Sequence, residues 1–437
     1  MSPRRVLHVV HDYPPEFRGG VERSAEMLVR RQRAAGADAR VLCGSQRVAR
    51  RAVVEASELD GVPIARLVRG PGLRDRVDAF RADLVPLYER VLDAFRPEVV
   101  HLHHWADLGD DLVRRAARRG VPTVVTLYDF YATCALCFRQ PVLDAPCDRP
   151  QHGDVCAPCI GPRFGVDDGE VRFRVETRRE AMAAELRAAA VVTAPSASHR
   201  RALAPHLPDD VAVEVVPLMS ATSTALPRRA RNGRLRVLHF GNLCRLKGVE
   251  FLLDAVERAD PDGDRIDLRL AGALTEPDLD LRGVRQHGPY DERSLPAICA
   301  DADLAVFPSF ARETYGIVVD EALRLGLPVL ASDRGALPER LGERGLALPA
   351  GDLDRWARML ARLADDPAAL DRLQNAPLPA LPAPDDVGAA FDALYDQARR
   401  AGPRPVDIEV ALLRRLERFE RALGDYFERS GGEPRGR

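Results

Sequence analysis

The chain alternates short runs of β-branched residues with longer amphipathic stretches, and this pattern stops once and then starts again. The first series runs from RVLHVV at 5–10 to VAVEVVP at 211–217 and includes a strand predicted over 187–195. The second runs from RLRVLHFG at 234–241 to LPVLAS at 327–332 and includes a helix predicted over 249–259. Such alternation is typical of strand–helix–strand units on a parallel sheet with helices on both faces. The sequence therefore predicts an α/β protein of two tandem doubly wound, Rossmann-like domains.

A polar, irregular segment at 221–233 separates the two series and is interpreted as a linker. The predicted domains are thus 1–220 and 234–385. The remainder, 386–437, is expected to form two helices that pack back on the body, the second at 405–428, before a disordered tail. Ligands of doubly wound folds bind at the carboxyl ends of the strands, so functional residues are expected in the loops there, facing a cleft between the domains.

Composition excludes several classes of protein. Among 437 residues, 64 basic side chains are balanced by 66 acidic ones, whereas a nucleic-acid-binding protein would carry a basic surplus. There is no apolar run of 18 residues, so no membrane-spanning helix is predicted. His11 and Asp12 interrupt the N-terminal apolar run too early for a signal peptide. We therefore expect a cytoplasmic protein without a nucleic-acid partner, with the inner membrane surface as the alternative location.

One residue count is informative. Of the 64 basic residues, 63 are arginine and one, Lys247, is lysine. A lysine ammonium is a compact charge, whereas a guanidinium is a planar fork. Lys247 lies in GNLCRLKG between a predicted strand and a predicted helix, where a cation and free backbone N–H groups favour phosphate binding. Chance survival of a single lysine is the alternative.

Two more loops carry residues suited to a nucleotide-sugar. In HDYPPEFRGGVE, Gly19 and Gly20 allow the backbone to approach a ligand at the start of a helix. In the second domain, Glu313 and Glu321 are separated by seven residues, and the helix that contains Glu321 is expected to begin near Gly316. Carboxylates beside an anion-binding helix start can accept hydrogen bonds from sugar and ribose hydroxyls.

Together these segments resemble the retaining glycosyltransferases of family 4, which have the GT-B fold. The resemblance is carried by PPEFRGGVE, by GNLCRLKG in place of the family's Gly-Arg-Leu-x-x-x-Lys-Gly, by the Glu-x7-Glu stretch FPSFARETYGIVVDEALRLGLPVLAS, and by ALPERL. It spans about residues 5–350. It implies transfer of a sugar, with retention and without a catalytic metal, from a nucleotide-diphosphate sugar to an acceptor in polysaccharide, glycolipid or metabolite biosynthesis.

The resemblance also implies roles for individual residues. Lys247 would bind the donor diphosphate, Glu321 the ribose hydroxyls and Glu313 the donor sugar. The implied donor-binding set is Gly19, Gly20, Asn242, Arg245, Lys247, Glu313, Tyr315, Gly316, Ile317 and Glu321. The N-terminal domain would hold the acceptor, and Glu313, Lys247 and Tyr128 would be the catalytic residues.

Two positions depart from the family pattern. Asn242 stands where the family often has arginine, so Arg245 is the nearby candidate for the missing phosphate cation. Tyr128-Asp129 stands where the family commonly has His-Asp, and tyrosine can donate a hydrogen bond but titrates only near pH 10. The acceptor-side candidates are His11, His103, His104 and Asp129, with strand-end packing as the alternative role for His103 and His104.

These departures keep two other functions open. One is a catalytically inactive GT-B binding protein that uses a cysteine cluster to dock a partner. The other is a soluble sugar or sugar-phosphate synthase. For the transferase the expected partners are a nucleotide-diphosphate sugar and a sugar, lipid-linked or small-molecule acceptor. Peripheral membrane contact through RRAARR at 114–119 is weighed against a solvated helix face.

Five of the eight cysteines fall in an insertion at about 131–162 that is expected to be loop-like. Two C-x-x-C pairs in it suit a tetrahedral thiolate metal site. Some family-4 enzymes resemble this segment, and the resemblance maps the ligands to Cys134, Cys147, Cys156 and Cys159, with Cys137 spare. A structural zinc is expected, with an iron–sulfur cluster, disulfides or free thiols as alternatives. Four sulfurs would leave no open position for catalysis.

Overall fold

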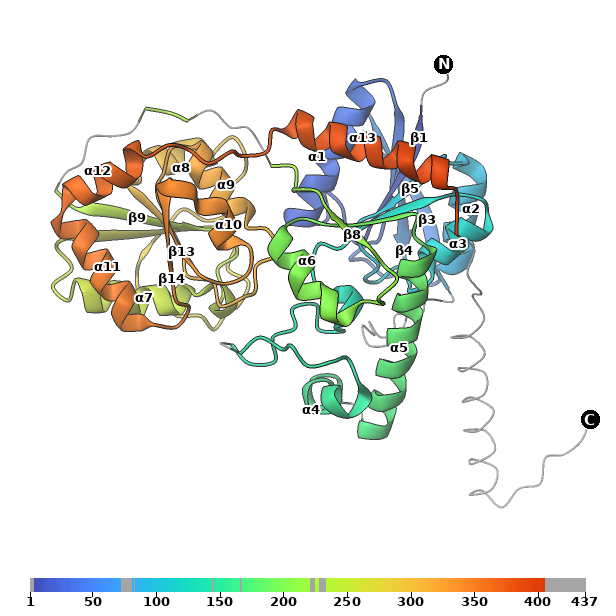
Figure 1. Cartoon of the computed structure of the whole chain (residues 1–437), viewed down its shortest axis with the longest axis horizontal. Coiled ribbons are helices and arrows are strands. Elements are labelled where there is room, and N and C mark those ends of the chain that lie inside the picture. Colours follow the sequence, from blue (N-terminus) through green and yellow to red (C-terminus); the bar gives the residue numbers. More distant parts are fainter. Residues whose placement is uncertain are drawn as a thin grey trace, which may run out of the picture.

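Two α/β lobes lie side by side along the long axis of the molecule (Figure 1). The structure, a computed structural model, describes residues 4–71, 81, 83–143, 145–165, 167–220, 225–227 and 233–404. Most of the predicted linker at 221–233 lies outside the described residues, as do the predicted helix at 405–428 and the tail.

The N-terminal domain is built on an eight-stranded sheet in the order β3-β4-β2-β1-β5-β6-β7-β8. All neighbouring strands run parallel except β3, which pairs antiparallel with β4. The elements are β1 (Arg5–Val10), α1 (Gly20–Ala34), β2 (Asp38–Cys43), β3 (Val53–Leu59), β4 (Val62–Val68), α2 (Val85–Phe95), β5 (Val99–Leu102), α3 (Leu112–Arg118), β6 (Thr123–Thr126), η1 (Tyr131–Thr133), α4 (Gly153–Phe164), α5 (Asp168–Ala188), β7 (Val191–Ala194), α6 (Ala197–Leu203), η2 (Ala204–His206) and β8 (Val213–Val215).

The C-terminal domain contains a six-stranded parallel sheet in the order β11-β10-β9-β12-β13-β14. Its elements are β9 (Leu235–Phe240), η3 (Arg245–Lys247), α7 (Val249–Ala259), β10 (Ile266–Ala271), β11 (Arg285–Gln286), α8 (Leu295–Ala300), β12 (Leu304–Phe307), α9 (Ile317–Arg324), β13 (Val329–Ser332), α10 (Leu337–Leu341), η4 (Gly342–Arg344), β14 (Gly345–Leu348), α11 (Leu353–Asp365) and α12 (Pro367–Asn375). The prediction of two parallel-sheet α/β domains is confirmed.

The last described helix, α13 (Pro384–Ala401), leaves the C-terminal lobe and lies across the N-terminal one (Figure 1). Its buried Phe391 and Tyr395 pack with Val6 of β1 and Val99 of β5. Burial of aromatic side chains of this size stabilises by about 2 kcal/mol or more each. The helix therefore ties the two domains together.

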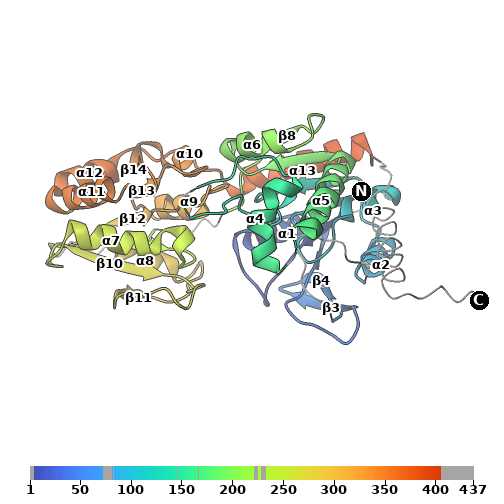
Figure 2. The same cartoon turned by 90° about the horizontal axis from the view of Figure 1, so that it is seen from below.

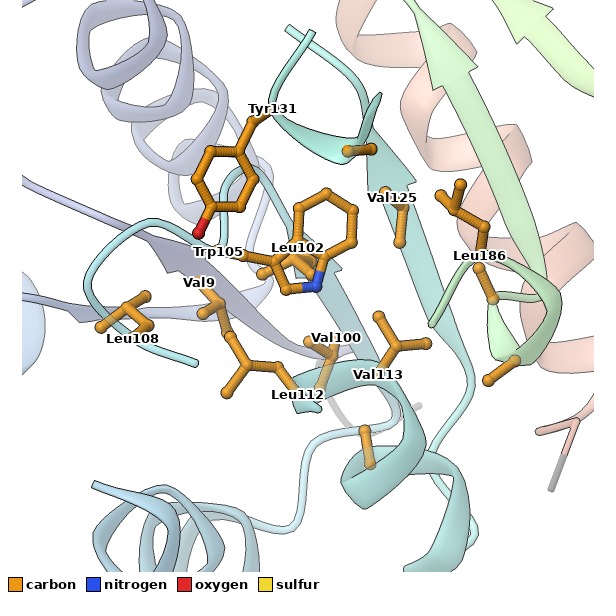
Figure 3. Packing of buried hydrophobic residues seen from close by; sticks show 14 of the residues in the cluster. Val9, Val100, Leu102, Trp105, Leu108, Leu112, Val113, Val125, Tyr131 and Leu186 are labelled. Carbon is orange, nitrogen blue, oxygen red and sulfur yellow. The ribbon is translucent and has the colours of Figure 1, made fainter. Parts of the chain in front are cut away.

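Trp105, which follows β5, lies in the centre of the N-terminal core (Figure 3). Its ring stacks on Tyr131 at 6.4 Å between centroids, and its indole Nε1 donates to Glu185 of α5 at 2.9 Å. Glu185 is fully buried and also accepts from Arg114 Nε at 3.0 Å. Removing one partner from such a buried pair costs about 3–5 kcal/mol, because the other charge is left uncompensated. This contact fixes the edge of the sheet from which the functional loops leave.

Most predicted elements match the observed ones, with three differences. The cysteine segment is not loop throughout, because Cys156 and Cys159 lie on α4. The strand predicted over 187–195 begins only at Val191, since α5 continues to Ala188. The β3–β4 hairpin was not predicted from the sequence.

Candidate active site at the domain interface

In the C-terminal domain, two loops that follow neighbouring strands meet through an ion pair. Lys247, at the end of η3 after β9, places Nζ 2.7 Å from Oε1 of Glu313, in the loop after β12. Ser309 Oγ donates to the same carboxylate oxygen at 2.6 Å. Burial works to lower the pKa of Lys247, but the Glu313 carboxylate outweighs it, so the pKa is raised. The ammonium is therefore charged and held at the carboxyl edge of the sheet.

Two glycines make this close approach of loops possible. Gly248 has φ +78°, and a Cβ there would lie 2.1 Å from the carbonyl oxygen of Pro308. Gly335, which directly precedes the segment ALPERL, has φ +62°. A Cβ there would lie 2.1 Å from the carbonyl oxygen of Glu313. Any side chain would push the Lys247 and Glu313 loops out of place, since both contacts are with backbone.

The helix after Glu313 begins at the interface between the lobes. Gly316, with φ +88°, caps α9, and no side chain makes a capping hydrogen bond at this helix start. Figure 2 shows α9 on the side of the C-terminal lobe that faces the N-terminal lobe. Tyr315 and Ile317 pack there against Tyr128 and Leu218 of the N-terminal domain. Gly20 lies opposite, where a Cβ would be 3.5 Å from Ile317 Cδ1.

Glu321 of α9 is buried, and only one of its two carboxylate oxygens has a hydrogen-bond partner among the described residues. Its Oε1 accepts from Arg23 of α1 at 2.8 Å, which is an ion pair between the domains. Its Oε2 is buried and has no hydrogen-bond partner among the described residues. Burial raises the pKa of this carboxyl, although Arg23 opposes the shift. A hydroxyl group that reached Oε2 would satisfy an acceptor that is otherwise costly to bury.

On the N-terminal side, the loop after β1 brings His11 to Glu22 of α1. The His11 Nε2 to Glu22 Oε1 distance is 3.2 Å, and Glu22 Oε2 accepts from the backbone N–H of Gly19 at 2.9 Å. Burial raises the pKa of Glu22 to about 7. Glu22 therefore both caps the helix and exchanges a proton near neutral pH beside the cleft.

A second pair lies beside the first. His104, after β5, places Nε2 3.2 Å from Oδ2 of Asp129, after β6, and its Nδ1 accepts from the amide of Ala106. The rings of His104 and His11 are 4.4 Å apart between centroids. Burial would raise the pKa of Asp129, but His104 and the Tyr131 amide lower it overall, so the carboxylate stays ionised. Three of the four predicted acceptor-side residues, His11, His104 and Asp129, thus lie together.

Two predicted residues of this side point into the core instead. His103 is 1% exposed; its Nε2 contacts His8 Nδ1 at 3.0 Å and its Nδ1 contacts Tyr128 at 2.8 Å. His8 Nε2 is bonded to the Gln32 side-chain oxygen, so this chain of contacts requires Tyr128 to donate its hydroxyl proton to His103. The prediction that Tyr128 donates to the substrate, and that His103 faces the acceptor, is corrected by this burial.

Arg245, the predicted phosphate-binding residue, forms ion pairs with other side chains instead. Its guanidinium contacts Glu250 at 3.1 Å and both Glu276 and Asp278 at 3.0 Å, on the outer side of the loop. Three carboxylates already neutralise this charge, so Arg245 does not replace the arginine that the family often has at Asn242. Asn242 itself is exposed at the start of the loop.

The cysteine segment gathers the four predicted ligands and separates the fifth cysteine from them. Cys134, Cys147 and Cys159 all act electrostatically on the thiol of Cys156. Cys137 is buried instead in the main core of the domain. None of these thiols is in a disulfide. Among the described residues, no trio that includes a cysteine has all its ligand atoms within 4.8 Å of one another, so the sulfurs are near each other but not closed into a tetrahedron.

The basic run at 114–119 is bound by carboxylates. Arg114 pairs with Glu185, Arg115 with Asp111 at a short distance, and Arg119 with Asp93 at 2.9 Å. Paired guanidiniums have little remaining attraction for anionic lipid, so this run does not support the predicted membrane contact. Among the helices of the described residues, none is both long and apolar enough to cross a bilayer.

Sequence reasoning missed Glu22, Arg23, Ser309 and Gly335. A glutamate three residues after Gly19 at a helix start fits the capping-box spacing, which could have identified Glu22. Arg23 and Ser309 have no such pattern, because their partners lie far away in the sequence.

Two family descriptions match most of the chain. Residues 19–219 match "Glycosyl transferase 4-like domain", and residues 234–366 match "Glycosyl transferases group 1". The first match covers the N-terminal domain from the Gly19 loop onward. The second contains Lys247, Glu313 and Glu321.

Curated relatives match over part of their length. Glycogen synthase of Mycobacterium tuberculosis (strain ATCC 25618 / H37Rv) is 31% identical over 192 residues, which is 41% of this chain and 46% of that protein. MMP alpha-(1->4)-mannosyltransferase of Mycolicibacterium hassiacum is 34% identical over 175 residues, 37% of this chain and 42% of that protein. The chain thus spans less than half the length of these relatives.

Solved structures match over almost the whole chain. Sucrose-phosphate synthase from Thermosynechococcus elongatus has a TM-score of 0.65 at 19% identity and covers 91% of this chain and 100% of its own. Anabaena Alr3699/HepE, in complex with UDP and glucose, has a TM-score of 0.56 at 16% identity, covering 91% and 97%. At these identities the likeness concerns the fold.

Proposed function

Because this chain belongs to the group 1 glycosyltransferases with the GT-B fold, we propose that it transfers a sugar, with retention, from a nucleotide-diphosphate sugar to an acceptor. The observation that carries the proposal is the pairing of Lys247 with Glu313 at 2.7 Å beside the start of α9. This places a fixed cation, a carboxylate and free helix amides at one point of the cleft, which suits a diphosphate joined to a sugar.

On the donor side, each group has one task. Lys247 would hold the diphosphate and stabilise the negative charge that grows on it as the sugar leaves. Glu313 would then be released to bind a sugar hydroxyl. The buried, unpartnered Oε2 of Glu321 would accept from a ribose hydroxyl. Arg23 would remain on the other oxygen, Oε1, of Glu321.

On the acceptor side, the two pairs His11–Glu22 and His104–Asp129 would orient the attacking hydroxyl. His104 follows β5, and Tyr128 follows the neighbouring strand β6. It would supply the imidazole that the family pattern places at the position of Tyr128, with Asp129 fixing its tautomer. No catalytic metal enters this proposal, and the donor phosphate itself would take the acceptor proton.

We also propose that Cys134, Cys147, Cys156 and Cys159 hold a structural zinc. Cys156 and Cys159 are three residues apart on α4 and so share a face of that helix. The four thiols are reduced and near one another, which is the donor set that tetrahedral zinc prefers. Bound zinc would supply no reactive group; it would fix a segment that has little regular structure of its own.

The test is turnover with a panel of UDP-, GDP- and ADP-sugars, measured as release of nucleoside diphosphate with and without candidate acceptors. Glu313→Gln should keep nucleotide binding but lower turnover by on the order of 10²–10³, the loss typical of a group that acts in the transition state. Glu343→Gln, an exposed carboxylate of the same domain, is the control.

Of three other outcomes, the first would reject the proposal and the other two would narrow it. Tight nucleotide binding by wild type without any turnover would favour the inactive binding protein. Efficient transfer to free sugars or sugar phosphates alone would favour the synthase. Equal turnover of Glu313→Gln and wild type would remove Glu313 from the site.

A further inference from the structure

Two arginines are buried beside the cysteine segment without an acidic partner. Arg139 is 3% exposed and Arg178 is 1% exposed. Elsewhere in this domain, the buried arginine Arg114 is paired with a carboxylate, Glu185. Among the described residues, neither Arg139 nor Arg178 has a carboxylate within ion-pair distance. Asp148 acts on Arg139 electrostatically, but not as an ion-pair partner. Two positive charges are therefore buried in one region without a paired carboxylate, which is unfavourable unless an anion is close.

Arg139 connects the parts of the segment that carry the cysteines. Its guanidinium donates to the carbonyl oxygens of Thr133 at 2.8 Å and Cys147 at 3.0 Å, and to that of Arg149. Thr133 precedes the first predicted ligand, and Arg149 follows Cys147 by two positions. Carbonyl oxygens satisfy its N–H groups but leave its charge unneutralised.

Arg178, on α5, is less well satisfied. One terminal nitrogen donates to the carbonyl oxygen of Tyr131, and the guanidinium carbon lies 4.2 Å above the Tyr131 ring. Its Nε and its other terminal nitrogen are buried and have no hydrogen-bond partner among the described residues. A buried guanidinium with two orphaned donors indicates that an acceptor is missing at this place.

The charges of Arg139 and Arg178 both act on the thiol of Cys134. Cys134 belongs to the set of four that also includes Cys147, Cys156 and Cys159. A divalent ion with four thiolate ligands has a net charge of about −2, because each bound cysteine loses its proton. Two guanidiniums would balance that charge.

We infer that Arg139 and Arg178 are the counter-charges of an anionic tetrathiolate metal site formed by Cys134, Cys147, Cys156 and Cys159. This inference rests on the zinc proposal and says which residues allow the site to be buried. Arg139 donates to carbonyl oxygens of the cysteine segment, including that of Cys147, and the charges of both arginines would offset the negative charge of the site. Neutral thiols or disulfides at the same place would leave both guanidiniums uncompensated.

The test measures metal affinity rather than transferase activity. Wild-type protein purified without added metal should contain about one zinc per chain by elemental analysis. Affinity is then measured by competition with a chelator for wild type, Arg178→Gln, Arg178→Lys and Arg179→Gln. Arg179 is the next residue on α5, is exposed, and pairs with Glu176 at 2.6 Å, so it is the matched control.

Arg178→Gln should bind zinc on the order of 10–100-fold more weakly, the loss typical of a residue in the outer shell of a metal site. Arg178→Lys, which keeps the charge, should recover most of the affinity, and Arg179→Gln should equal wild type. Should Arg178→Gln fail to fold, Arg139→Gln is measured in the same way with the same expectation.

Different failures point to different steps of the argument. Wild type without zinc or iron above background overturns both the metal proposal and the counter-charge inference, whereas nucleotide-sugar turnover would be untouched by that result. Wild type with one zinc, together with equal affinity in Arg178→Gln and Arg139→Gln, overturns the counter-charge inference alone. Equal weakening by Arg178→Lys and Arg178→Gln also overturns it, since charge would then not matter.

Discussion

The two domains present the same edge of a parallel sheet to the cleft, but different side chains lie there. In the C-terminal domain, the loops after β9 and β12 are joined by Lys247 and Glu313, which hold full charges. In the N-terminal domain, the loops after β1, β5 and β6 are joined through His11 and His104. Eight of the ten histidines precede residue 207, whereas the single lysine is in the second domain.

This difference agrees with the two tasks that we propose. A diphosphate is permanently charged, and a fixed cation binds it at any physiological pH. An acceptor hydroxyl is neutral until it reacts, and groups such as Glu22, with a pKa of about 7, can orient it and exchange protons with it. One domain thus supplies a charged wall, formed by Lys247 and Glu313, and the other a titratable wall, formed by His11, Glu22, His104 and Asp129.

The strongest test of the charged wall is Lys247→Ala. Nucleoside-diphosphate affinity should fall roughly ten- to a hundred-fold, which is the loss of a charge-assisted contact of about 1.5–3 kcal/mol. Turnover should fall further, because negative charge grows on the leaving phosphate. Calorimetric binding and initial rates measure the two effects.

Lys247→Arg sharpens the same comparison. The wider guanidinium must fit where a compact ammonium lies against Glu313 and Ser309, so transfer should be poor although the charge is kept. Wild-type rates in Lys247→Arg would show that the lone lysine has no special role. Wild-type rates in Lys247→Ala would remove the whole loop from the donor site.

The buried histidines behind this wall should make the N-terminal domain the more acid-sensitive one. Burial lowers the pKa of His8 to about 4 and those of His101 and His103 well below 6.5. Below pH 6.5 the unfolded chain takes up protons that the folded domain refuses, so stability falls as the pH falls from 6.5 towards 4. For His8 alone the loss is about 2 kcal/mol at pH 5.

Hydrogen exchange followed by mass spectrometry can locate this effect. After correction for intrinsic exchange rates, peptides of β1 and β5 should lose protection between pH 6.5 and 5 before peptides of β9 and β12 do. His239 is the buried counterpart in the C-terminal domain, where fewer histidines titrate. Simultaneous loss in both domains, or earlier loss in the C-terminal one, would contradict the comparison.

Tyr128→Phe tests whether this tyrosine takes part in the reaction or only stabilises the core. The variant leaves Nδ1 of His103 without its 2.8 Å partner, so the free energy of unfolding should fall by about 1–3 kcal/mol. Turnover should change little, since the hydroxyl does not face the cleft. A large loss of turnover at unchanged thermal stability would return Tyr128 to the catalytic set.

The smallest expected effect concerns contacts between the domains at the cysteine segment. Arg312, next to Glu313, pairs with Asp148 at 2.6 Å, and Asp148 is largely exposed. Asp148→Asn should therefore change stability by less than about 1 kcal/mol. The Michaelis constant for the donor should stay within a few-fold of wild type. A larger rise in that constant alone would mean that the cysteine segment positions the Glu313 loop.

The periodicity of the sequence determined the two α/β domains, most of their elements and the loops in which Lys247, Glu313 and Glu321 lie. These features depend on local repeats of apolar residues and on the rule that loops after parallel strands share an edge. Helix α7, predicted over 249–259, begins and ends at those residues. The choice of Cys134, Cys147, Cys156 and Cys159 came from the resemblance to family-4 enzymes, since the spacing alone gives two C-x-x-C pairs.

The tertiary structure alone decided which way the side chains point. His103 and His104 are adjacent in the sequence, yet one faces the core and the other the cleft, because successive residues in extended chain point to opposite sides. Arg245 and Lys247 lie on one turn, but only Lys247 meets Glu313, 66 residues away. Arg23 and Glu321 pair across 298 residues. Such contacts depend on how the domains pack, which no local pattern encodes.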